Sequence, residues 1–441
     1  SPNMLLNAAD KALWRLAIPM IFSNITVPLL GLVDTAVIGH LDSPVYLGGV
    51  AVGATATSFL FMLLLFLRMS TTGLTAQAWG AKDPQRLARA LVQPLALALG
   101  AGVLIILLRL PLIDLALHIV GGSEAVLEQA RRFLEIRWLS APASLANLVL
   151  LGWLLGVQYA RAPVILLVVG NLLNIVLDLW LVMGLRMNVQ GAALATVTAE
   201  YATLIIGLLM AKRVLTLRGV SLAMLKNAWR GDLRRLLALN RDIMLRSLLL
   251  QLCFGALTVF GARLGSDIVA VNAVLMTMLT FTAYALDGFA YAVEAHSGQA
   301  YGARDGSQLL EVWRAACRQS GMVALAFALI YSLAGQYIIA LLTSLPSLQQ
   351  LADRYLIWQT ILPVVGVWCY LLDGMFIGAT RGAEMRNSMA VAAAGFAVTL
   401  LTLPVLGNHG LWLALAVFLA LRGLSLALIW RRHWRRGTWF S

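Results

Sequence analysis

An acidic residue lies on a polar stripe inside an apolar stretch of the chain. Residues 170–182, with the sequence GNLLNIVLDLWLV, carry Asn171, Asn174 and Asp178 at helical spacings. Residues three and four apart share one face of a helix. A carboxylate in hydrocarbon is costly unless it faces protein or water, so Asp178 is a candidate for a functional site. The alternative is a buried aspartate that only joins two helices through hydrogen bonds.

Polar residues of other apolar segments reach a similar depth. Asp34, Asp178 and Thr196 lie about five to seven residues from the outer ends of their predicted helices, which at about 1.5 Å per residue is roughly 8–10 Å below the membrane boundary. Asn174 lies one turn deeper. Two carboxylates, an amide and a hydroxyl can share a proton or coordinate a small hard cation. We therefore predict that these four residues form a cation- or proton-coupling site.

The elements that must position these residues are membrane helices. The chain has 441 residues, of which 61% are hydrophobic and 12% are charged, and its mean hydropathy is +0.84. Apolar stretches of about 20 residues or more recur along the whole chain, and each is long enough to cross a bilayer. We predict an all-α polytopic membrane protein with 12 transmembrane helices, at approximately 11–39, 47–77, 87–109, 125–151, 162–184, 189–211, 237–263, 268–298, 308–331, 349–379, 387–406 and 410–431.

The net charge of +13 does not indicate a nucleic-acid partner. Most basic residues lie in short loops beside the predicted helices, among them Lys82, Arg161, Arg304 and Arg381, and the positive-inside rule explains them. We therefore expect both termini to be cytoplasmic. The sequence start lacks the pattern of a removable signal peptide, so the first apolar segment is interpreted as helix 1.

The sequence shows no pattern of an enzyme or a metal site. Cys253, Cys317 and Cys369 are widely separated and form no Cys/His cluster. The five histidines are scattered, and no nucleophile, base and acid occur together. We expect no enzymatic activity, no resident metal and no cofactor, the only ion being the coupling ion H⁺ or Na⁺.

An internal repeat divides the chain into halves. QAWGAKD at 77–83 reappears as QAYGARD at 299–305, and the pairs Pro142/Pro363 and Gly156/Gly378 recur at nearly the same offset. The polar, partly amphipathic segment 212–236 separates six predicted helices from six. We predict an N-lobe at 1–211, a cytoplasmic connector at 212–236 on the membrane surface and a C-lobe at 237–441. Two parallel six-helix repeats are typical of alternating-access transporters.

The repeat also makes the polar site asymmetric. At the repeat offset, Asp34 corresponds to a position near Ala256 and Asp178 to one near Thr399, so the second half lacks both acids. If the acids only stabilised the fold, the second half would need something similar. Their absence there favours a specialised site in the first half.

The second half has acids of its own. Asp287, Tyr291 and Glu294 share one face of predicted helix 8, and Asp373 lies in the inner part of helix 10. We hypothesise that Arg68 of helix 2 pairs with Asp287 or Glu294 and helps to close the cytoplasmic side. The alternative is that each charge is neutralised within its own half.

Methionines accompany these charges on helices 2 and 8. Met69 and Met276 are either core-filling residues or part of a cleft that accepts varied apolar and aromatic molecules. Pro19 lies inside helix 1, where it removes a backbone hydrogen bond and predicts a bend.

The motifs together resemble those of the multidrug and toxic compound extrusion (MATE) transporters over essentially the whole chain, and look like the proteobacterial DinF branch. The resemblance is carried by GLVDTAVIGHL, GLTAQAWGAKD, NLLNIVLD, GAALAT, EAHSGQAYGAR and YLLDGMFIGATRG. It implies two pseudo-symmetric six-helix lobes of the MATE fold, and export of a substrate in exchange for an inward cation.

The resemblance also implies roles for residues. Those corresponding to Asp34, Asn174, Asp178 and Thr196 form the cation site of the N-lobe in the DinF branch. Pro19 matches a helix 1 proline whose bending on protonation has been proposed. Asp373 matches a helix 10 acid that other branches use in the C-lobe, together with a helix 7 glutamate that this chain lacks.

The expected function is that of a proton-coupled secondary exporter of amphiphilic or cationic compounds. Sodium coupling and a flippase for a lipid-linked precursor are the alternatives; the flippase would need a strongly basic central cleft. We expect a monomeric, multi-pass protein of the bacterial inner membrane, whose partners are small amphiphilic molecules and the lipid bilayer.

Overall fold

The chain folds into helices joined by short loops. The computed structural model describes residues 7–231 and 233–441, and of 26–35 it describes the backbone only. The first part of the chain forms α1 (Ala8–Gly39), α2 (Pro44–Leu63), α3 (Phe66–Gly80), α4 (Pro84–Leu107), α5 (Arg109–Val120), α6 (Glu124–Arg137), α7 (Ala141–Gly156), α8 (Arg161–Asp178), α9 (Asn188–Leu217) and α10 (Leu222–Asn227). The second part forms α11 (Leu233–Leu264), α12 (Ser266–Gly302), α13 (Gly306–Leu342), α14 (Pro346–Gly378), α15 (Gly382–Thr399), α16 (Leu403–Leu406) and α17 (Asn408–Arg436).

The predicted all-α polytopic fold is confirmed. Eleven spans in the described part of the chain are long and apolar enough to cross a membrane, and α1, which contains 26–35, adds a further helix of 32 residues. Several spans are less regular than their hydropathy predicts. The second is broken at Leu64 and Leu65 between α2 and α3, and the fifth ends in the π-helix Leu179–Gly184.

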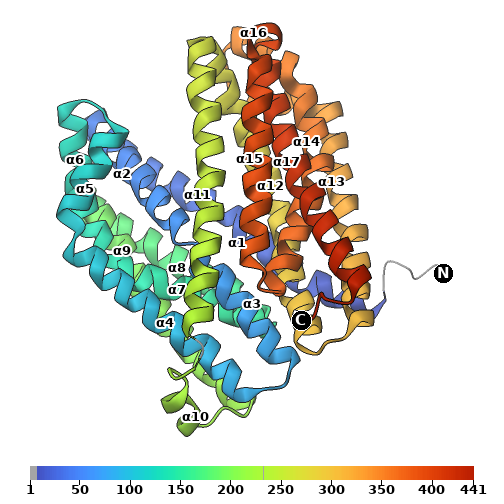
Figure 1. The fold of residues 1–441 in the computed structure, drawn as a ribbon. Coiled ribbons are helices and arrows are strands. Elements are labelled where there is room, and N and C mark those ends of the chain that lie inside the picture. The colour runs from blue at the N-terminus through green and yellow to red at the C-terminus, as the bar shows by residue number, and fades with distance from the viewer. Residues whose placement is uncertain (1–6, 232) are drawn as a thin grey trace. The chain divides into compact units, whose positions relative to one another are not determined.

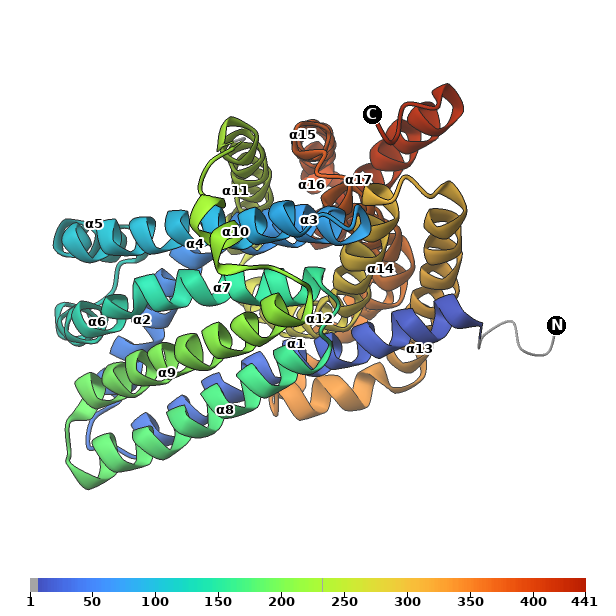
Figure 2. The same ribbon diagram turned by 90° about the horizontal axis from the view of Figure 1, so that it is seen from below.

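The helices form two compact units. One contains Ile25–Leu237, and the other contains Ala238–Ser441 together with the described residues up to Asn24. In the first unit α7 packs against both α4 and α9 (Figure 2). In the second unit α14 packs against α12, α13 and α17, and α15 packs against α17 (Figure 1). Each unit has its own buried apolar core.

The boundary between the units lies inside α1, whereas the sequence predicted a lobe that begins with the whole of helix 1. The first turns of α1 are fixed to α13, because the fully buried carboxylate of Asp10 accepts hydrogen bonds from Arg318 at 3.0 Å and from Gln319 at 3.2 Å. Further along, α1 approaches α12 so closely that a Cβ at Gly288 would lie 2.3 Å from the side chain of Ile21. The helix therefore begins in one unit and ends in the other.

The repeat extends to backbone conformation. Lys82 and Arg304 have φ angles of 55° and 53°, and each precedes an aspartate that caps the next helix through its side chain. A Cβ at Gly156 would lie 2.6 Å from Thr75, and one at Gly378 would lie 2.5 Å from Ser297, the residue that corresponds to Thr75. The α3–α7 crossing and the α12–α14 crossing thus depend on small residues at equivalent positions of the two halves.

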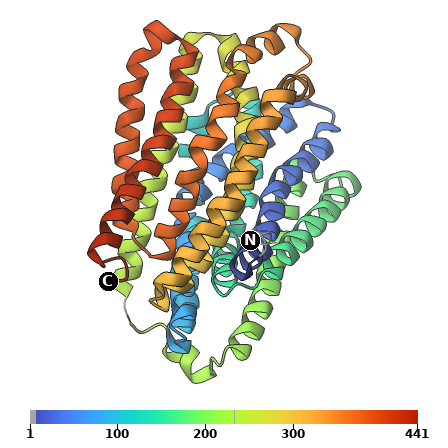
Figure 3. The ribbon, with the colours of Figure 1, turned by 90° about the vertical axis from the view of Figure 1, so that its right-hand side faces the viewer.

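The connector packs on the end of α3 and α4 that is predicted to face the cytoplasm (Figure 3). Gln85 and Gln93 of α4 donate to the carbonyls of Met224 and Trp229, at 3.4 and 3.2 Å. The guanidinium of Arg218 lies 3.9 Å above the ring centre of Trp79. The connector therefore forms part of the first unit.

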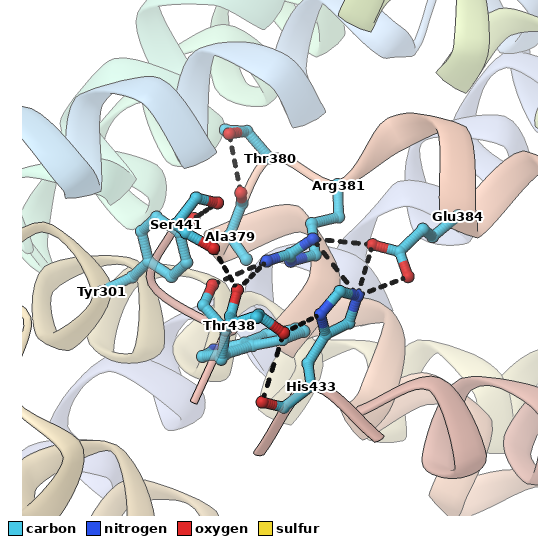
Figure 4. Close-up of polar contacts among 9 residues, drawn as sticks. Tyr301, Ala379, Thr380, Arg381, Glu384, His433, Thr438 and Ser441 are labelled. Atoms are coloured by element: carbon cyan, nitrogen blue, oxygen red, sulfur yellow. Dashed lines mark hydrogen bonds and ion pairs between the residues drawn. The ribbon is translucent and has the colours of Figure 1, made fainter. Parts of the chain in front are cut away.

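The last residues of the chain fold back onto the second unit (Figure 4). Arg381 donates to the carbonyl oxygens of Thr438 and Trp439, at 3.0 and 2.8 Å, and to Glu384 at 2.8 Å. His433 lies 3.0 Å from the same glutamate. The indole of Trp439 is buried against Phe376 and other rings. This packing closes the end of the unit between α14 and α17.

Candidate cation-coupling site

A buried polar cluster lies between α8 and α9 of the first unit. Asn174 and Asp178 occupy successive turns of α8 and are 2% and 0% exposed, while Thr196 of α9 is 9% exposed. The amide of Asn174 donates to the hydroxyl of Thr196 at 3.3 Å, and that hydroxyl donates to the carbonyl of Ala192 at 3.2 Å. The structure thus brings Asn174 and Thr196, two of the four residues that the sequence predicts for the coupling site, into contact, and places the buried Asp178 one turn further along α8.

The local backbone around Asp178 is unusual. Asp178 is the last residue of α8, and the π-helix Leu179–Gly184 follows it directly. A π-helix shifts the hydrogen-bond register by one residue, and such segments occur often at functional sites. A Cβ at Gly191 would lie 3.1 Å from the carbonyl of Leu181, so α9 starts in close contact with this segment. The register change therefore lies directly beside the buried carboxylate.

The polar atoms of this cluster differ from those of a structural amide pair. In the second unit Asn272 and Asn408 exchange hydrogen bonds at 2.9 and 2.8 Å, and Trp412 donates to the Asn272 oxygen at 3.0 Å. By contrast, the buried Oδ1 of Asn174 accepts no hydrogen bond from any described residue. Buried polar groups that serve only the fold are normally satisfied. Among the described residues the Asn174 oxygen therefore has no hydrogen-bond donor, unlike the amide oxygens of the Asn272–Asn408 pair.

The fourth predicted residue, Asp34, lies on the part of α1 whose side chains are outside the description. The same helix continues to Val37 and Ile38, which are buried in an apolar cluster with Val182 and Ala192. Val182 belongs to the π-helix after Asp178, and Ala192 lies one turn before Thr196. The end of α1 that carries Asp34 thus belongs to the same lobe as the polar cluster.

The corresponding positions of the second unit are apolar. At the repeat offset of 222, Asn174 and Thr196 correspond to Phe396 and Phe418, whose rings are 6.1 Å apart in an edge-to-face pair. Thr399, near the position that matches Asp178, donates its hydroxyl to the carbonyl of Gly395 in its own helix. The asymmetry predicted from the acids therefore includes the whole cluster.

Asp373 lies in a network that the sequence analysis missed. Its Oδ2 atom accepts from Arg246 of α11 at 2.6 Å and from Arg422 of α17 at 2.5 Å, and all three residues are less than 10% exposed. Two guanidinium groups thus compensate one carboxylate and join three helices. An arginine inside an apolar segment usually has a buried partner, and this signal could have identified the network. The network of Arg246 and Arg422 explains how the charge of Asp373 is compensated although the chain lacks the helix 7 glutamate.

The other candidates of the second unit lie on α12. Glu294 is 2% exposed, whereas Asp287 and Tyr291 are half-buried. Met276 packs against the apolar core of this unit. Their role in a substrate cleft or gate stays a prediction.

In the first unit, Arg68 and Met69 of α3 are 3% and 5% exposed. Arg68 donates to the hydroxyl of Thr72 at 3.1 Å. Its hypothesised pairing with Asp287 or Glu294 would join the two units and stays a prediction. Pro19 lies within α1, which remains one helix from Ala8 to Gly39, so the predicted bend is not a helix break.

The described residues contain no group of three or more His, Cys, Asp or Glu side chains that could hold a metal ion. The oxygens of Asn174, Asp178 and Thr196 suit a proton or a monovalent hard cation better than a resident transition metal, which prefers nitrogen or sulfur ligands.

Comparison with known proteins identifies the family. The profile of the MatE family matches residues 19–180 and 243–406, one range in each half of the chain. The chain is 87% identical over 436 residues to DNA damage-inducible protein F of Escherichia coli (strain K12), covering 99% of this chain and 95% of that protein. It is 23% identical over 431 residues to the probable multidrug resistance protein NorM of Acinetobacter baylyi, covering 95% of this chain and 94% of that one. The resemblance to the DinF branch is thereby confirmed.

Solved structures agree on the fold. A crystal structure of a MATE protein in the bent conformation matches with a TM-score of 0.84 at 24% identity, covering 97% of this chain and 96% of that chain. The structure described as the straight conformation matches with a TM-score of 0.85 at 23% identity, covering 98% and 97%. We conclude that the chain belongs to the MatE family and is a multi-pass membrane transporter, not an enzyme.

Proposed function

We propose that the protein is a cation-coupled antiporter that exports amphiphilic or cationic compounds by alternating access, with the proton as coupling ion. The observation that carries this proposal is the buried cluster of Asn174, Asp178 and Thr196, whose amide and hydroxyl correspond to Phe396 and Phe418 and whose acid corresponds to a position near Thr399 in the second unit. A coupling site needs a group whose charge changes within a protected environment, and Asp178 is such a group. The name of a relative, the probable multidrug resistance protein NorM, supports the export of drugs as the function.

Helix α1 connects the proposed coupling site with the opposite lobe. Asp34 lies one turn before Ile38 on α1, and the first turns of the same helix are fixed to α13 by Asp10 and Arg318. Protonation of Asp178 would remove a buried charge beside the apolar cluster in which Val37 and Ile38 of α1 pack against Val182. The ion would then favour one shape of α1 over another, which is how a ligand shifts a conformational equilibrium. Asp34 and Pro19 belong to this step of the proposal.

The test is transport in proteoliposomes that contain the full chain, with a fluorescent lipophilic cation as substrate. A pH gradient imposed in sodium-free buffer should drive transport by the unaltered protein. Asp178→Asn keeps the side-chain size but cannot titrate, so proton-driven transport should fall by about tenfold or more, within the usual range of coupling energies. Asp42→Asn, an exposed change in the same unit, is the matched control and should retain transport.

Two results would contradict the proposal. Transport by D178N that still follows the pH gradient would exclude Asp178 as the coupling group. Transport driven by a sodium gradient at equal pH, and not by a pH gradient, would replace the proton by sodium at the same oxygens.

The flippase alternative is less well supported. It expects many basic groups inside the lobes, whereas Arg246 and Arg422, which lie within spans of the second unit, both donate to Asp373. The charge of these two arginines is thus partly compensated by Asp373 and less available to a lipid phosphate, which favours an exporter of amphiphilic compounds.

A further inference from the structure

A basic, partly open cavity lies at the surface of the first unit, away from the coupling cluster. It has a volume of about 120 Å³, which is far more than the space that one buried water needs. Its polar wall consists of Arg86, Arg89 and Gln93 of α4 and Arg235 at the start of α11. Apolar residues, including Leu74, Pro94 and Leu236, complete the lining. The cavity therefore combines guanidinium groups with a hydrocarbon surface.

The three arginines are close enough for their charges to interact. Arg86 is repelled by both Arg235 and Arg89, and the acid whose charge acts on it is Asp83. The Asp83 side chain already accepts from the backbone amides of Gln85 and Arg86 as the cap of α4. Three arginines thus border the cavity, Asp83 is the carboxylate among the described residues whose charge acts on Arg86, and an anion placed among the arginines would relieve their repulsion.

The surrounding backbone leaves room for these side chains. The Nε of Arg89 donates to the carbonyl of Arg230 at 3.1 Å, which holds this side chain against the connector. Gly231 has a φ of +132°, and a Cβ there would lie 2.6 Å from the Arg89 guanidinium. Glycine lets the connector pass directly over this arginine. Arg235 donates to the buried Gln77 at 3.5 Å, which directs it toward the end of α3.

The position of the cavity suggests where the anion comes from. Arg86 is the third residue of α4 and follows the loop that the positive-inside rule places in the cytoplasm. Trp229 of the neighbouring connector is 62% exposed, as is usual for tryptophan at a membrane–water interface. Basic pockets at this level beside membrane helices bind the head groups of anionic lipids.

We propose that this cavity binds a phosphate group, supplied by the head group of an acidic phospholipid in the adjacent leaflet. Arginine suits this ligand because its planar guanidinium pairs with two phosphate oxygens at once. The phosphate would join α4 to the start of α11, and the apolar wall would accept the glycerol and first methylenes of the lipid. This site is separate from the coupling cluster and does not depend on which ion drives transport.

The test uses the full chain purified in neutral detergent, with lipid binding measured by native mass spectrometry and by the shift in melting temperature. Phosphatidylglycerol should bind and stabilise the protein, whereas phosphatidylethanolamine, which has no net charge, should do so much less. In the double variant Arg86→Gln/Arg235→Gln the affinity for phosphatidylglycerol should fall by about tenfold or more, since each arginine near a lipid surface contributes about 1 kcal/mol.

The matched control is Arg213→Gln/Arg234→Gln. It removes the same charge from exposed positions of the same unit that do not line the cavity. Its affinity should stay within about twofold of the unaltered protein, because long-range attraction alone is weak in salt. An equal loss in both double variants would overturn the proposal, as would equal stabilisation by the two lipids.

A third arm distinguishes the source of the phosphate. Inorganic phosphate is added at millimolar concentration. If it stabilises the unaltered protein but not R86Q/R235Q, the site belongs to a soluble phosphate compound. Stabilisation by phosphatidylglycerol alone would assign it to the lipid. The melting temperature without ligand shows that each variant is folded, and the single variant R86Q replaces the double one if it is not.

Discussion

At the scale of residues, two buried aspartates in apolar helices have different surroundings. Asp373 is held by Arg246 and Arg422, so its charge is compensated inside the fold. Asp373 therefore joins α11, α14 and α17 of the second unit through its charge. Asp178 is equally buried and lies one turn after Asn174 on α8, directly before the π-helix.

This difference predicts the outcome of neutralising Asp373. Asp373→Asn leaves two buried guanidinium groups without a counter-charge, so the free energy of unfolding should fall by about 3–5 kcal/mol. The measurement is thermal or denaturant unfolding in detergent. Asp353→Asn, an exposed change on the same helix, should alter it by less than about 0.5 kcal/mol.

A functional readout separates this role from a role in coupling. Whatever transport remains in folded D373N should keep its dependence on the pH gradient. A variant of full stability that has lost this dependence would show that Asp373 carries the coupling proton instead.

At the scale of elements, small residues decide how closely the helices approach. Gly152 and Gly156 of α7 face α3, and a Cβ at Gly152 would lie 2.5 Å from the carbonyl of Arg68. Gly374 and Gly378 of α14 face α12 in the same way, with a Cβ at Gly374 2.7 Å from the carbonyl of Ala290. Close backbone approach through small residues is a usual means of packing membrane helices. Both lobes therefore need glycine at equivalent positions.

Enlarging these positions should damage both lobes similarly. Gly156→Val and Gly378→Val should each lower the free energy of unfolding by about 1–3 kcal/mol or more, because the neighbouring helix must move. Gly100→Ala is the control, since nothing lies within 4 Å of a Cβ at that helical position. It should be neutral or stabilising by up to about 1 kcal/mol. Equal melting temperatures for all three variants in detergent would refute this account of the crossings.

At the scale of the whole molecule, α1 is the element that the two units share. Its first turns belong to the unit that contains α13, and its last residues belong to the unit that contains α8 and α9. A change of shape in this helix can therefore affect both units. The anchor at its start is the pair of Asp10, which is fully buried, and Arg318, whose side chain is 28% exposed.

Loosening this anchor should weaken transport and free the start of α1. Asp10→Asn and Arg318→Gln should each cost about 1–3 kcal/mol of stability, less than a fully buried pair because Arg318 reaches solvent. The double variant should cost little more than either single one, since the groups act together. Hydrogen exchange should rise at 8–20 and stay unchanged at 36–39. Fully additive costs, or unchanged exchange at 8–20, would mean that the pair does not hold the helix.

The sequence by itself determined the class of protein, its repeat and most of the coupling cluster. Hydropathy fixes where helices cross a membrane, because each backbone polar group must be satisfied inside lipid. The spacing of Asn174 and Asp178 along one helix is a local property, so their shared face followed from the pattern alone. The missing acids at Ala256 and Thr399 likewise needed only the offset of the repeat.

The tertiary structure decided what lies between distant segments. Asp373 and Arg246 are 127 residues apart in the chain, and Asp10 and Arg318 are 308 apart, so no local pattern predicts these pairs. The π-helix after Asp178 and the continuation of α1 from one unit into the other depend on tertiary packing. The helix propensities of single residues do not encode that packing. Local chemistry therefore indicated which residues could bind an ion, and only the packing of helices decided which buried charges are already compensated.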